Sequence, residues 1–151
     1  MEIDLESIPP EGLTIEGAES PGIMDLPDAT VEFLQPIHYR VHASRVGNMV
    51  LVKGELSTIA RFCCSRCLKE FESLIAVPDF RAQKEATAPQ GIIDLTDAVR
   101  EDIILALPAK PLCEAGCRGL CPRCGRDLNA GICDCHPPQE DSPFAALNGI
   151  A

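Results

Sequence analysis

Aromatic residues and long apolar runs are scarce in this sequence. It has no tryptophan, one tyrosine and five phenylalanines among 151 residues, so a hydrophobic core has to rest mainly on Val, Ile and Leu. No apolar stretch reaches the roughly 20 residues that cross a bilayer. Residues 1–6 have neither the basic start nor the apolar run of a signal peptide. The sequence therefore predicts a cytoplasmic protein with no membrane partner.

Basic residues are absent from the first 39 positions, which hold nine acidic residues. All 13 Lys and Arg residues lie in the rest of the chain, where acids are about as many, and the net charge is −10. This is not the overall basic footprint of a strong nucleic-acid binder. An acidic surface favours basic partners such as ribosomal proteins. A solvated acidic face that only keeps the protein soluble is the alternative.

Signatures of catalytic sites are also missing. The sequence contains no glycine-rich phosphate loop, no Gly-x-Ser-x-Gly elbow and no His-Glu-x-x-His pair. The carboxylate pairs Asp94/Asp97 and Glu101/Asp102 are explained by the start and the exposed side of a predicted helix. The sequence therefore predicts a protein that is not an enzyme and has no small-molecule substrate.

Residues 31–82 have the alternation of antiparallel strands. Two apolar-polar runs, 37–43 and 49–62, flank the hairpin turn Gly47-Asn48. Gly54 inside the second run predicts a bulge or bend, as a small curved sheet or barrel requires.

A further run over residues 71–77 follows the pair Cys64-x2-Cys67, which places that pair at a hairpin tip. A thioredoxin-type redox pair would instead be followed by a helix. Strand alternation prevents Cys63 and Cys64 from pointing at one metal. Cys64 has the ligand spacing, and we expect Cys63 to be a small buried residue.

One helix is predicted over residues 95–107. Its apolar residues recur at spacings of three and four, Asp94 can cap its start, and Pro108 stops it. The predicted class is α+β, with a small antiparallel β-sheet or barrel-like domain, one packing helix and a C-terminal Cys-rich zinc knuckle. The expected parts are an acidic Pro/Gly-rich segment (1–30), the β domain (31–108), a Cys-rich zinc-binding module (109–136) and a tail (137–151).

Nine cysteines in a cytoplasmic protein are typical of metal ligands rather than disulfides. Eight of them form four close pairs, which are Cys64 and Cys67, Cys113 and Cys117, Cys121 and Cys124, and Cys133 and Cys135. Eight thiolates suit two four-cysteine zinc sites with bonds of about 2.3 Å. Such sites have no open coordination position, so the one or two Zn²⁺ ions are expected to be structural.

Two groupings of these cysteines are compatible with the spacing. In the first, residues 121–135 hold one zinc locally, while Cys64 and Cys67 join Cys113 and Cys117 in a long-range site. In the second, a single zinc is held by four of the six C-terminal cysteines, and the hairpin pair stays free. The histidines are weaker substitute ligands, namely His38, His42 and His136.

Basic residues cluster around the cysteines. We expect five arginines to contact RNA phosphates, namely Arg61, Arg66, Arg118, Arg123 and Arg126.

Short motifs occur in a characteristic order after residue 60. They are Phe62-Cys-Cys-Ser-Arg-Cys-Leu-Lys-Glu-Phe71, Ile93-Asp-Leu95, Glu101-Asp-Ile-Ile-Leu-Ala-Leu-Pro108, Gly119-Leu-Cys-Pro-Arg-Cys-Gly125, Leu128-Asn129, Cys133-Asp-Cys135 and Phe144-Ala-Ala-Leu147. This series resembles the YceD family, the large ribosomal RNA subunit accumulation proteins, over roughly residues 30–150. The resemblance implies a bacterial or organellar factor for 23S rRNA accumulation, without known enzymatic activity. In that family the gene often neighbours that of a small basic ribosomal protein of the large subunit.

Three functional hypotheses follow. The first is a zinc-binding factor for biogenesis of the large ribosomal subunit, whose partners are ribosomal RNA, a basic large-subunit ribosomal protein, or both. The second is a protein-only chaperone or adaptor for a basic ribosomal protein. The third is a thiol-based or zinc-responsive redox sensor that uses Cys64 and Cys67.

Overall fold

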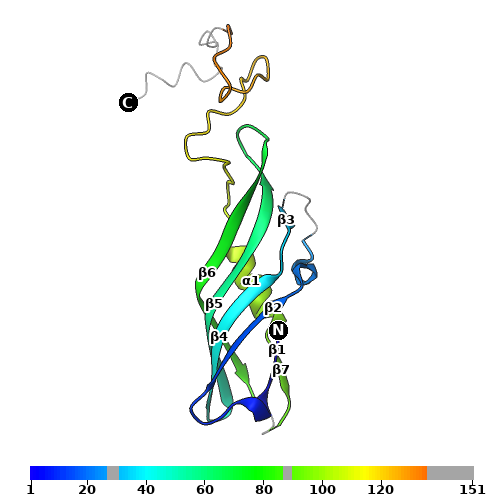
Figure 1. Cartoon of the computed structure of the whole chain (residues 1–151), viewed down its shortest axis with the longest axis vertical. Helices are drawn as coiled ribbons and strands as arrows, with labels where there is room; N and C mark the ends of the chain where they lie inside the picture. The colour runs from blue at the N-terminus through cyan, green and yellow to red at the C-terminus, as the bar shows by residue number, and fades with distance from the viewer. Residues whose placement is uncertain (27–30, 87–89, 136–151) are drawn as a thin grey trace, which may run out of the picture.

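Strands dominate the computed structural model, which describes residues 1–26, 31–86 and 90–135 (Figure 1). In chain order the elements are β1 (Glu2–Asp4), the 3-10 helix η1 (Leu5–Ser7), β2 (Leu13–Glu19), the 3-10 helix η2 (Pro21–Met24), β3 (Val31–Phe33), β4 (Ile37–Val46), β5 (Met49–Cys63), β6 (Glu70–Glu85), β7 (Ile92–Asp94) and α1 (Thr96–Leu105).

The main sheet is antiparallel and open. β2 pairs with β4, and β4 pairs with the first part of β5. β3 continues beside the last part of β5, and β6 lies along the opposite edge of β5. Among the described strands the edge strands β2 and β6 do not pair, so no barrel closes. The predicted α+β class is confirmed, whereas its barrel-like variant is replaced by an open sheet.

β5 and β6 form a long hairpin at the centre of the fold, and both β3 and β4 pair with β5 (Figure 1). Their pairing shifts register between Gly54 and Leu56, which confirms the predicted bulge. A side chain at Gly54 would place its Cβ 2.1 Å from the carbonyl oxygen of Arg40 on β4. Only glycine therefore lets the two strands approach at this point. The turn at the far end of the hairpin, residues 64–69, is the predicted position of the first cysteine pair.

The core lies on one face of this sheet, where α1 and the two-stranded ribbon β1–β7 cover it (Figure 1). The N-terminal part, which the sequence sets apart as an acidic segment, contributes β2 to the sheet and four side chains to the core, namely Met1, Ile3, Leu5 and Met24. Glu2, Asp4 and Glu16 are exposed because they alternate with buried or half-buried positions along β1 and β2, whereas Glu19 is half-buried.

α1 begins at Thr96 and ends at Leu105, slightly inside the predicted range of 95–107. Val99 and Ile103 are buried against the sheet. Leu95 occupies the N-cap without a side-chain bond, and the Asp94 carboxylate instead accepts the Thr96 N–H at 2.8 Å. In the described ranges no helix is long and apolar enough to cross a membrane.

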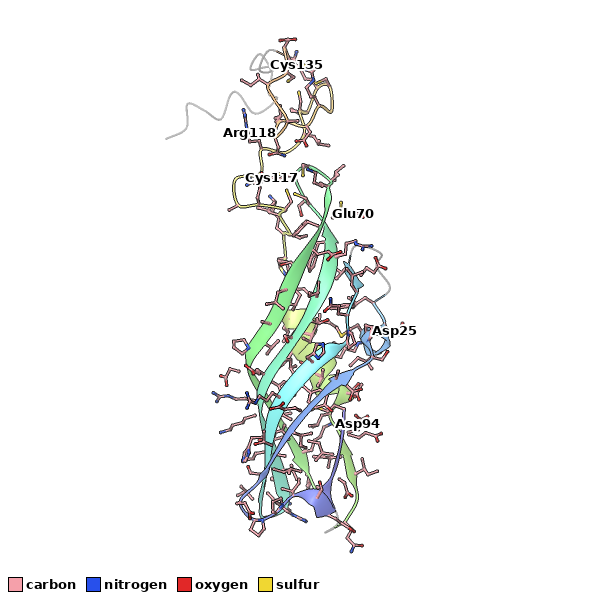
Figure 2. All side chains as sticks on the ribbon, in the orientation of Figure 1. Asp25, Glu70, Asp94, Cys117, Arg118 and Cys135 are labelled. Carbon is pink, nitrogen blue, oxygen red and sulfur yellow. The ribbon has the colours of Figure 1, made fainter. Side chains whose placement is uncertain are left out.

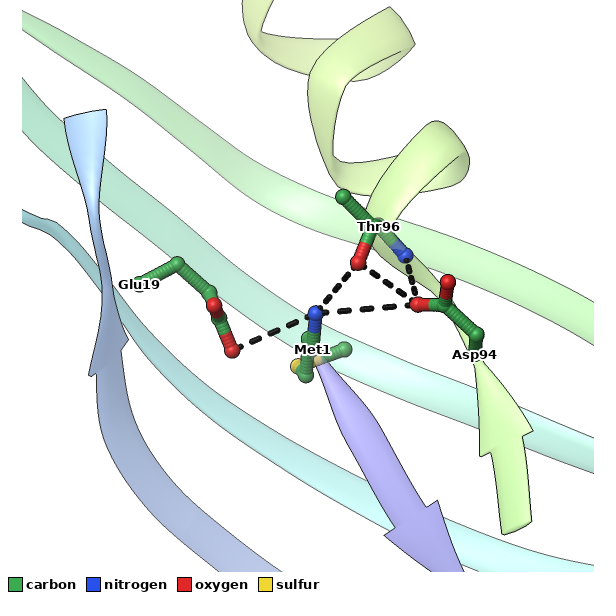
Figure 3. A network of polar contacts seen from close by, with 4 residues as sticks. All are labelled: Met1, Glu19, Asp94 and Thr96. Carbon is green, nitrogen blue, oxygen red and sulfur yellow. Dashed lines mark hydrogen bonds and ion pairs between the residues drawn. The ribbon is translucent and has the colours of Figure 1, made fainter. Parts of the chain in front are cut away.

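Asp94 belongs to a polar network that ties the start of the chain to the start of α1 (Figure 3). The Met1 ammonium group donates to Thr96 Oγ1 at 2.7 Å and pairs with Glu19 at 3.2 Å and Asp94 at 3.8 Å. Thr96 Oγ1 in turn donates to Asp94 Oδ1 at 2.6 Å. Hydrogen bonds from the Thr96 side chain, then from its backbone N–H, lower the pKa of the Asp94 carboxyl.

The lowered pKa predicts an acid-dependent contribution of Asp94 to stability. A carboxyl whose pKa is lower in the folded state stabilises the fold fully above its unfolded value, near 4. That contribution is lost as the pH falls through the lower folded pKa. We expect the stability gap between the protein and Asp94→Ala to be constant from pH 7 to about 5 and to shrink towards pH 3. Urea unfolding across this range measures the gap, and Asp97→Ala, one turn away, is the control. A gap that widens on acidification would contradict this assignment.

Candidate metal centres

The first group of cysteines, which we call the clamp centre, joins two parts of the chain that are distant in sequence. Cys64 and Cys67 come from the β5–β6 tip, and Cys113 and Cys117 come from the segment after α1. All four sulfurs lie within 4.8 Å of one another. Cys64 and Cys117 are 3.8 Å apart, and Cys67 and Cys113 are 3.6 Å apart. Three of the four residues are buried, and Cys117 is labelled in Figure 2.

The second group, which we call the terminal centre, is local. Its members are Cys121, Cys124, Cys133 and Cys135, with sulfurs again within 4.8 Å of one another. Cys121 is buried, whereas Cys124 is exposed and the other two are half-buried. Figure 2 places this centre beyond the clamp centre, at the end of the molecule farthest from the sheet. The structure thus brings the eight predicted cysteines together in the first of the two groupings, and their role as ligands stays a prediction.

The spacing of the sulfurs fits a tetrahedral metal. Four thiolates about 2.3 Å from one Zn²⁺ ion lie about 3.8 Å from each other, close to the separations in the clamp centre. All nine cysteines are free thiols, so no disulfide competes for these sulfurs. The donor set is all sulfur, which favours zinc over magnesium or calcium. Either centre could therefore hold a metal ion.

The two C-x2-C turns have the same backbone geometry. In the first, Leu68 N–H donates to Cys64 O at 2.9 Å, and Cys64 N–H donates to Lys69 O at 2.9 Å. The terminal centre repeats both bonds, from Gly125 to Cys121 and from Cys121 to Arg126, at 2.9 and 2.8 Å. The residue after the second cysteine is left-handed in each case, with φ of 61° at Leu68 and 70° at Gly125. The turns thus form one structural motif used twice.

Leu68 makes the first turn less stable than the second, which has glycine at the equivalent left-handed position. A left-handed backbone costs a residue with a Cβ about 1–2 kcal/mol, partly offset because glycine loses more entropy on folding. The Leu68 side chain is 64% exposed, so little packing is lost with it. We expect Leu68→Gly to raise the unfolding free energy by up to about 1 kcal/mol and to leave the metal content unchanged. Denaturant titration of the metal-loaded protein measures this, and a loss of stability would mean that Leu68 makes a contact it does not show here.

Backbone N–H groups favour ionisation of one thiol in each centre. The N–H groups of Cys124 and Arg123 lower the pKa of Cys121 to about 6. For Cys64, burial opposes ionisation, but several N–H groups, led by that of Cys113, outweigh it and lower the pKa to about 6.

Two other sulfurs, those of Cys113 and Cys135, resist ionisation in the absence of a cation. Burial, followed by the neighbouring sulfur of Cys67, raises the pKa of Cys113 to about 12. Contact with Cys124, followed by burial, raises the pKa of Cys135 to about 12. Several thiolates in so small a volume repel one another, and a divalent cation removes that repulsion. Each centre is therefore an arrangement that becomes favourable when a metal binds.

The clamp centre is also held by contacts other than sulfur. Arg66 Nη1 donates to Cys117 O at 2.7 Å, and Ser65 N–H donates to Pro111 O at 2.9 Å. Phe71, Leu112 and Leu120 pack against the sulfurs as a small cluster. Phe71 also packs against the main core, where its ring stacks on Phe62.

Three of the five arginines predicted to contact RNA have partners within the chain. Arg61 pairs with Glu32 at 3.0 Å and with Glu72 at 3.4 Å on the sheet. Arg66 and Arg126 donate to backbone carbonyls near the cysteines. The guanidinium groups of Arg118 and Arg123 are exposed and have no hydrogen bond or ion pair within the described ranges. These two arginines therefore remain the strongest candidates for phosphate contacts.

Two residues near the centres differ from the sequence-based expectation. Cys63 is exposed, and the prediction that it is buried is wrong. Strand alternation continues through Cys63, which faces outward opposite Glu70, while Cys64 has already left the strand. Asn129 was not predicted as a site residue, yet its Nδ2 donates to Cys117 Sγ at 3.4 Å. Its motif, Leu128-Asn129, was noticeable, but no spacing rule links an asparagine to a sulfur 12 residues away.

Comparison with known proteins identifies the family. The profile of the family described as large ribosomal RNA subunit accumulation protein YceD matches residues 78–151, which include α1 and six of the eight clustered cysteines. The chain is 29% identical over 58 residues to the large ribosomal RNA subunit accumulation protein YCED homolog 1, chloroplastic, of Arabidopsis thaliana. That region covers 38% of this chain and 18% of the plant protein.

Mycobacterial proteins match a longer region. The chain is 29% identical over 113 residues to an uncharacterized protein of Mycobacterium leprae, covering 65% of this chain and 52% of that protein. It is 33% identical over 98 residues to an uncharacterized protein of Mycobacterium tuberculosis, covering 55% and 47%. The chain thus matches about half of the mycobacterial proteins and a smaller share of the plant protein. No solved structure matches it. With its motifs, the family profile and the plant relative in agreement, the chain belongs to the YceD family of large ribosomal RNA subunit accumulation proteins.

Proposed function

We propose that this protein is a non-enzymatic, zinc-binding factor that promotes accumulation of 23S rRNA during biogenesis of the large ribosomal subunit. The observation that carries the proposal is the family match over residues 78–151, which contain most of the cysteines in the two four-sulfur centres. The family's name refers to accumulation of the large-subunit RNA, and the sulfur geometry supports a structural metal in each centre.

Zinc would be held in the clamp centre by residues 64, 67, 113 and 117 and in the terminal centre by residues 121, 124, 133 and 135. In both, the metal would supply cross-links that the short segment after α1 cannot obtain from a core of its own. Closed sites with four cysteines have no position for a substrate, which supports a structural role.

The charge distribution supports different partners for the two ends of the molecule. The exposed arginines Arg118 and Arg123 lie on the cysteine-rich part and would contact rRNA phosphates. The acids of residues 1–26 and 31–39 lie on the sheet part and would engage a basic ribosomal protein.

Depletion of the protein in its own host tests the proposal. We expect the ratio of 23S to 16S rRNA to fall, and we expect wild type and Cys63→Ser to restore it while Cys64→Ser does not. An unchanged ratio on depletion would overturn the proposed function. Affinity purification with and without nuclease tests the protein partner, because a basic ribosomal protein held by the acidic face stays bound after RNA is removed. Binding of the purified protein to an rRNA fragment separates the proposed factor from the protein-only adaptor, which does not bind RNA. Metal that leaves under mild peroxide would instead favour the redox sensor.

Charge reversal tests the RNA contact directly. We expect the double variant Arg118→Glu, Arg123→Glu to weaken binding to a large-subunit rRNA fragment at least about tenfold and to reduce the salt dependence by one to two phosphate contacts. The matched control is Arg40→Glu, Arg81→Glu, which makes the same charge change on the sheet, where both arginines are exposed. Equal losses of RNA affinity in the two double variants would show that the effect comes from net charge alone and not from contacts of Arg118 and Arg123. Filter binding across a salt series provides the measurement.

A further inference from the structure

The two cysteine centres are physically linked by one side chain. Asn129 lies in the loop between Cys124 and Cys133 and so belongs to the terminal centre by position. Its Nδ2 nevertheless donates to Cys117 Sγ of the clamp centre, with a separation of 3.4 Å. The loop of one centre thus supplies a hydrogen-bond donor to a sulfur of the other.

The direction of this hydrogen bond is fixed by the other contacts of the amide. Asn129 Oδ1 accepts the backbone N–H of Arg118 at 2.7 Å, and Nδ2 also donates to Asp127 Oδ1 at 2.8 Å. The Asn129 backbone N–H donates to the same Asp127 oxygen at 2.8 Å. A flipped amide would face an N–H with its own NH₂ group and a carboxylate with its own oxygen. The NH₂ group therefore points at the sulfur.

Backbone contacts hold the loop in this place. Leu128 N–H donates to Gly119 O at 2.9 Å, and Leu120 N–H donates to Arg66 O at 3.1 Å, next to the clamp turn. A Cβ at Gly119 would lie 3.0 Å from Arg66 O, and the residue has a φ of 76°, so glycine is required for this approach. The terminal loop therefore rests against the clamp turn, and Asn129 is not a loosely placed surface residue.

We propose that Asn129 is a positioning residue that couples the two metal centres. The proposal rests on the metal binding proposed above. An N–H donor to a metal-bound thiolate offsets its negative charge and fixes its orientation, and loss of such a partner typically costs 10–100-fold in metal affinity. Cys124 and Cys133 flank the Asn129 loop, so a metal in the terminal centre holds the donor against Cys117. Filling of either centre then strengthens the other by the same factor.

Two substitutions separate this role from a merely structural one. Asn129→Ala removes both the acceptor for Arg118 N–H and the donor to sulfur. Asn129→Asp keeps the acceptor but replaces the donor with a carboxylate that faces the thiolates. The proposal predicts that metal retention in the clamp centre falls in the order Asn, Ala, Asp. A structural role limited to Arg118 predicts instead that Asp retains metal as well as Asn does.

The readouts are chelator-driven zinc release and ¹¹³Cd NMR on the full chain, in which each four-thiolate centre gives its own resonance. Cys133→Ser assigns the terminal centre by removing its resonance. We expect Asn129→Ala to shift the clamp resonance and to accelerate clamp zinc release 10–100-fold, with a larger effect for Asn129→Asp. Asn48→Asp at the opposite end of β5 makes the same charge change, and we expect wild-type release from it.

Coupling adds a second, independent requirement. Cys133→Ser should accelerate clamp release by about the same factor as Asn129→Ala, and the double variant should release no faster than Cys133→Ser alone. Wild-type clamp release in both Asn129 variants, or additive effects in the double variant, would overturn the coupling. A wild-type protein that binds no metal would overturn the proposed metal binding itself. Two bound ions that exchange independently would overturn only the coupling between the centres.

Discussion

Replacement of Cys64 with serine is expected to reduce the zinc content from two ions to one per chain and to release residues 109–135 from the tip of the β5–β6 hairpin. The Cys64 side chain is fully buried in the clamp centre, 3.8 Å from the Cys117 sulfur. Serine oxygen is a poor zinc ligand, and three remaining thiolates do not close a tetrahedral site.

The effect should be large because the segment after α1 has little else to hold it. Apart from one isolated bridge between Leu120 and Asp127, this part of the described chain has no strand or helix. Its apolar contacts form the small cluster around the clamp sulfurs, which shares Phe71 with the core under the sheet. Structural zinc contributes about 10–16 kcal/mol to the folding of small zinc domains. Loss of the clamp should therefore leave the sheet folded and the cysteine-rich part detached.

Metal analysis and hydrogen exchange measure the two parts of this prediction. We expect Cys64→Ser to show one zinc per chain, slow exchange in β4 and β5, and fast exchange in residues 109–120. Cys63→Ser is a closely matched control, because it makes the same change one residue earlier, at an exposed thiol outside both centres. Two zinc ions retained by Cys64→Ser, or one lost from Cys63→Ser, would contradict the assignment of the clamp.

The position of the first cysteine pair could be predicted because strand alternation is visible in the sequence. The apolar-polar pattern before Cys64 and after Cys67 identifies a hairpin, and Gly54 identifies its bulge. The open sheet could not be distinguished from a barrel, because closure depends on whether β2 and β6 meet, and periodicity contains no information on distant edges.

The grouping of the cysteines was undetermined for a related reason. Short spacings identify the four pairs, but the approach of Cys64 to Cys117 depends on the position in space at which α1 ends and the following segment begins. The Asn129 contact is of the same kind, since it depends on the packing of two loops. Cys63 was placed on the wrong side because the exact residue at which a strand ends decides which of two adjacent cysteines faces inward.

The second large effect concerns the sheet, where Gly54→Ala is expected to destabilise the fold severely. The new Cβ would lie 2.1 Å from Arg40 O, 2.6 Å from Val41 Cα and 2.9 Å from Arg40 C. All three are backbone atoms of β4, so no side-chain rotation relieves the overlap. β4 and β5 must separate at the register pair Val41↔Gly54, which disturbs the fully buried Phe80 on the other side of Gly54.

Backbone displacement beneath a core aromatic residue belongs to the class of substitutions that cost more than about 4 kcal/mol. For a chain of this size, that corresponds to a fall in Tm of roughly 8–16 °C. Gly22→Ala is the matched control, because its Cβ would meet only Ser20 Oγ at 3.4 Å. Gly54 lies in the N-terminal half of β5, and the clamp centre lies beyond the C-terminal end of this strand. Gly54→Ala should therefore still bind two zinc ions below its Tm. A thermal scan with metal analysis therefore separates the stability of the sheet from metal binding at the clamp centre. A Gly54→Ala variant that kept the wild-type Tm would show that β4 and β5 do not approach closely at Gly54. A variant that lost zinc while still folded would show that the clamp centre depends on the bulge.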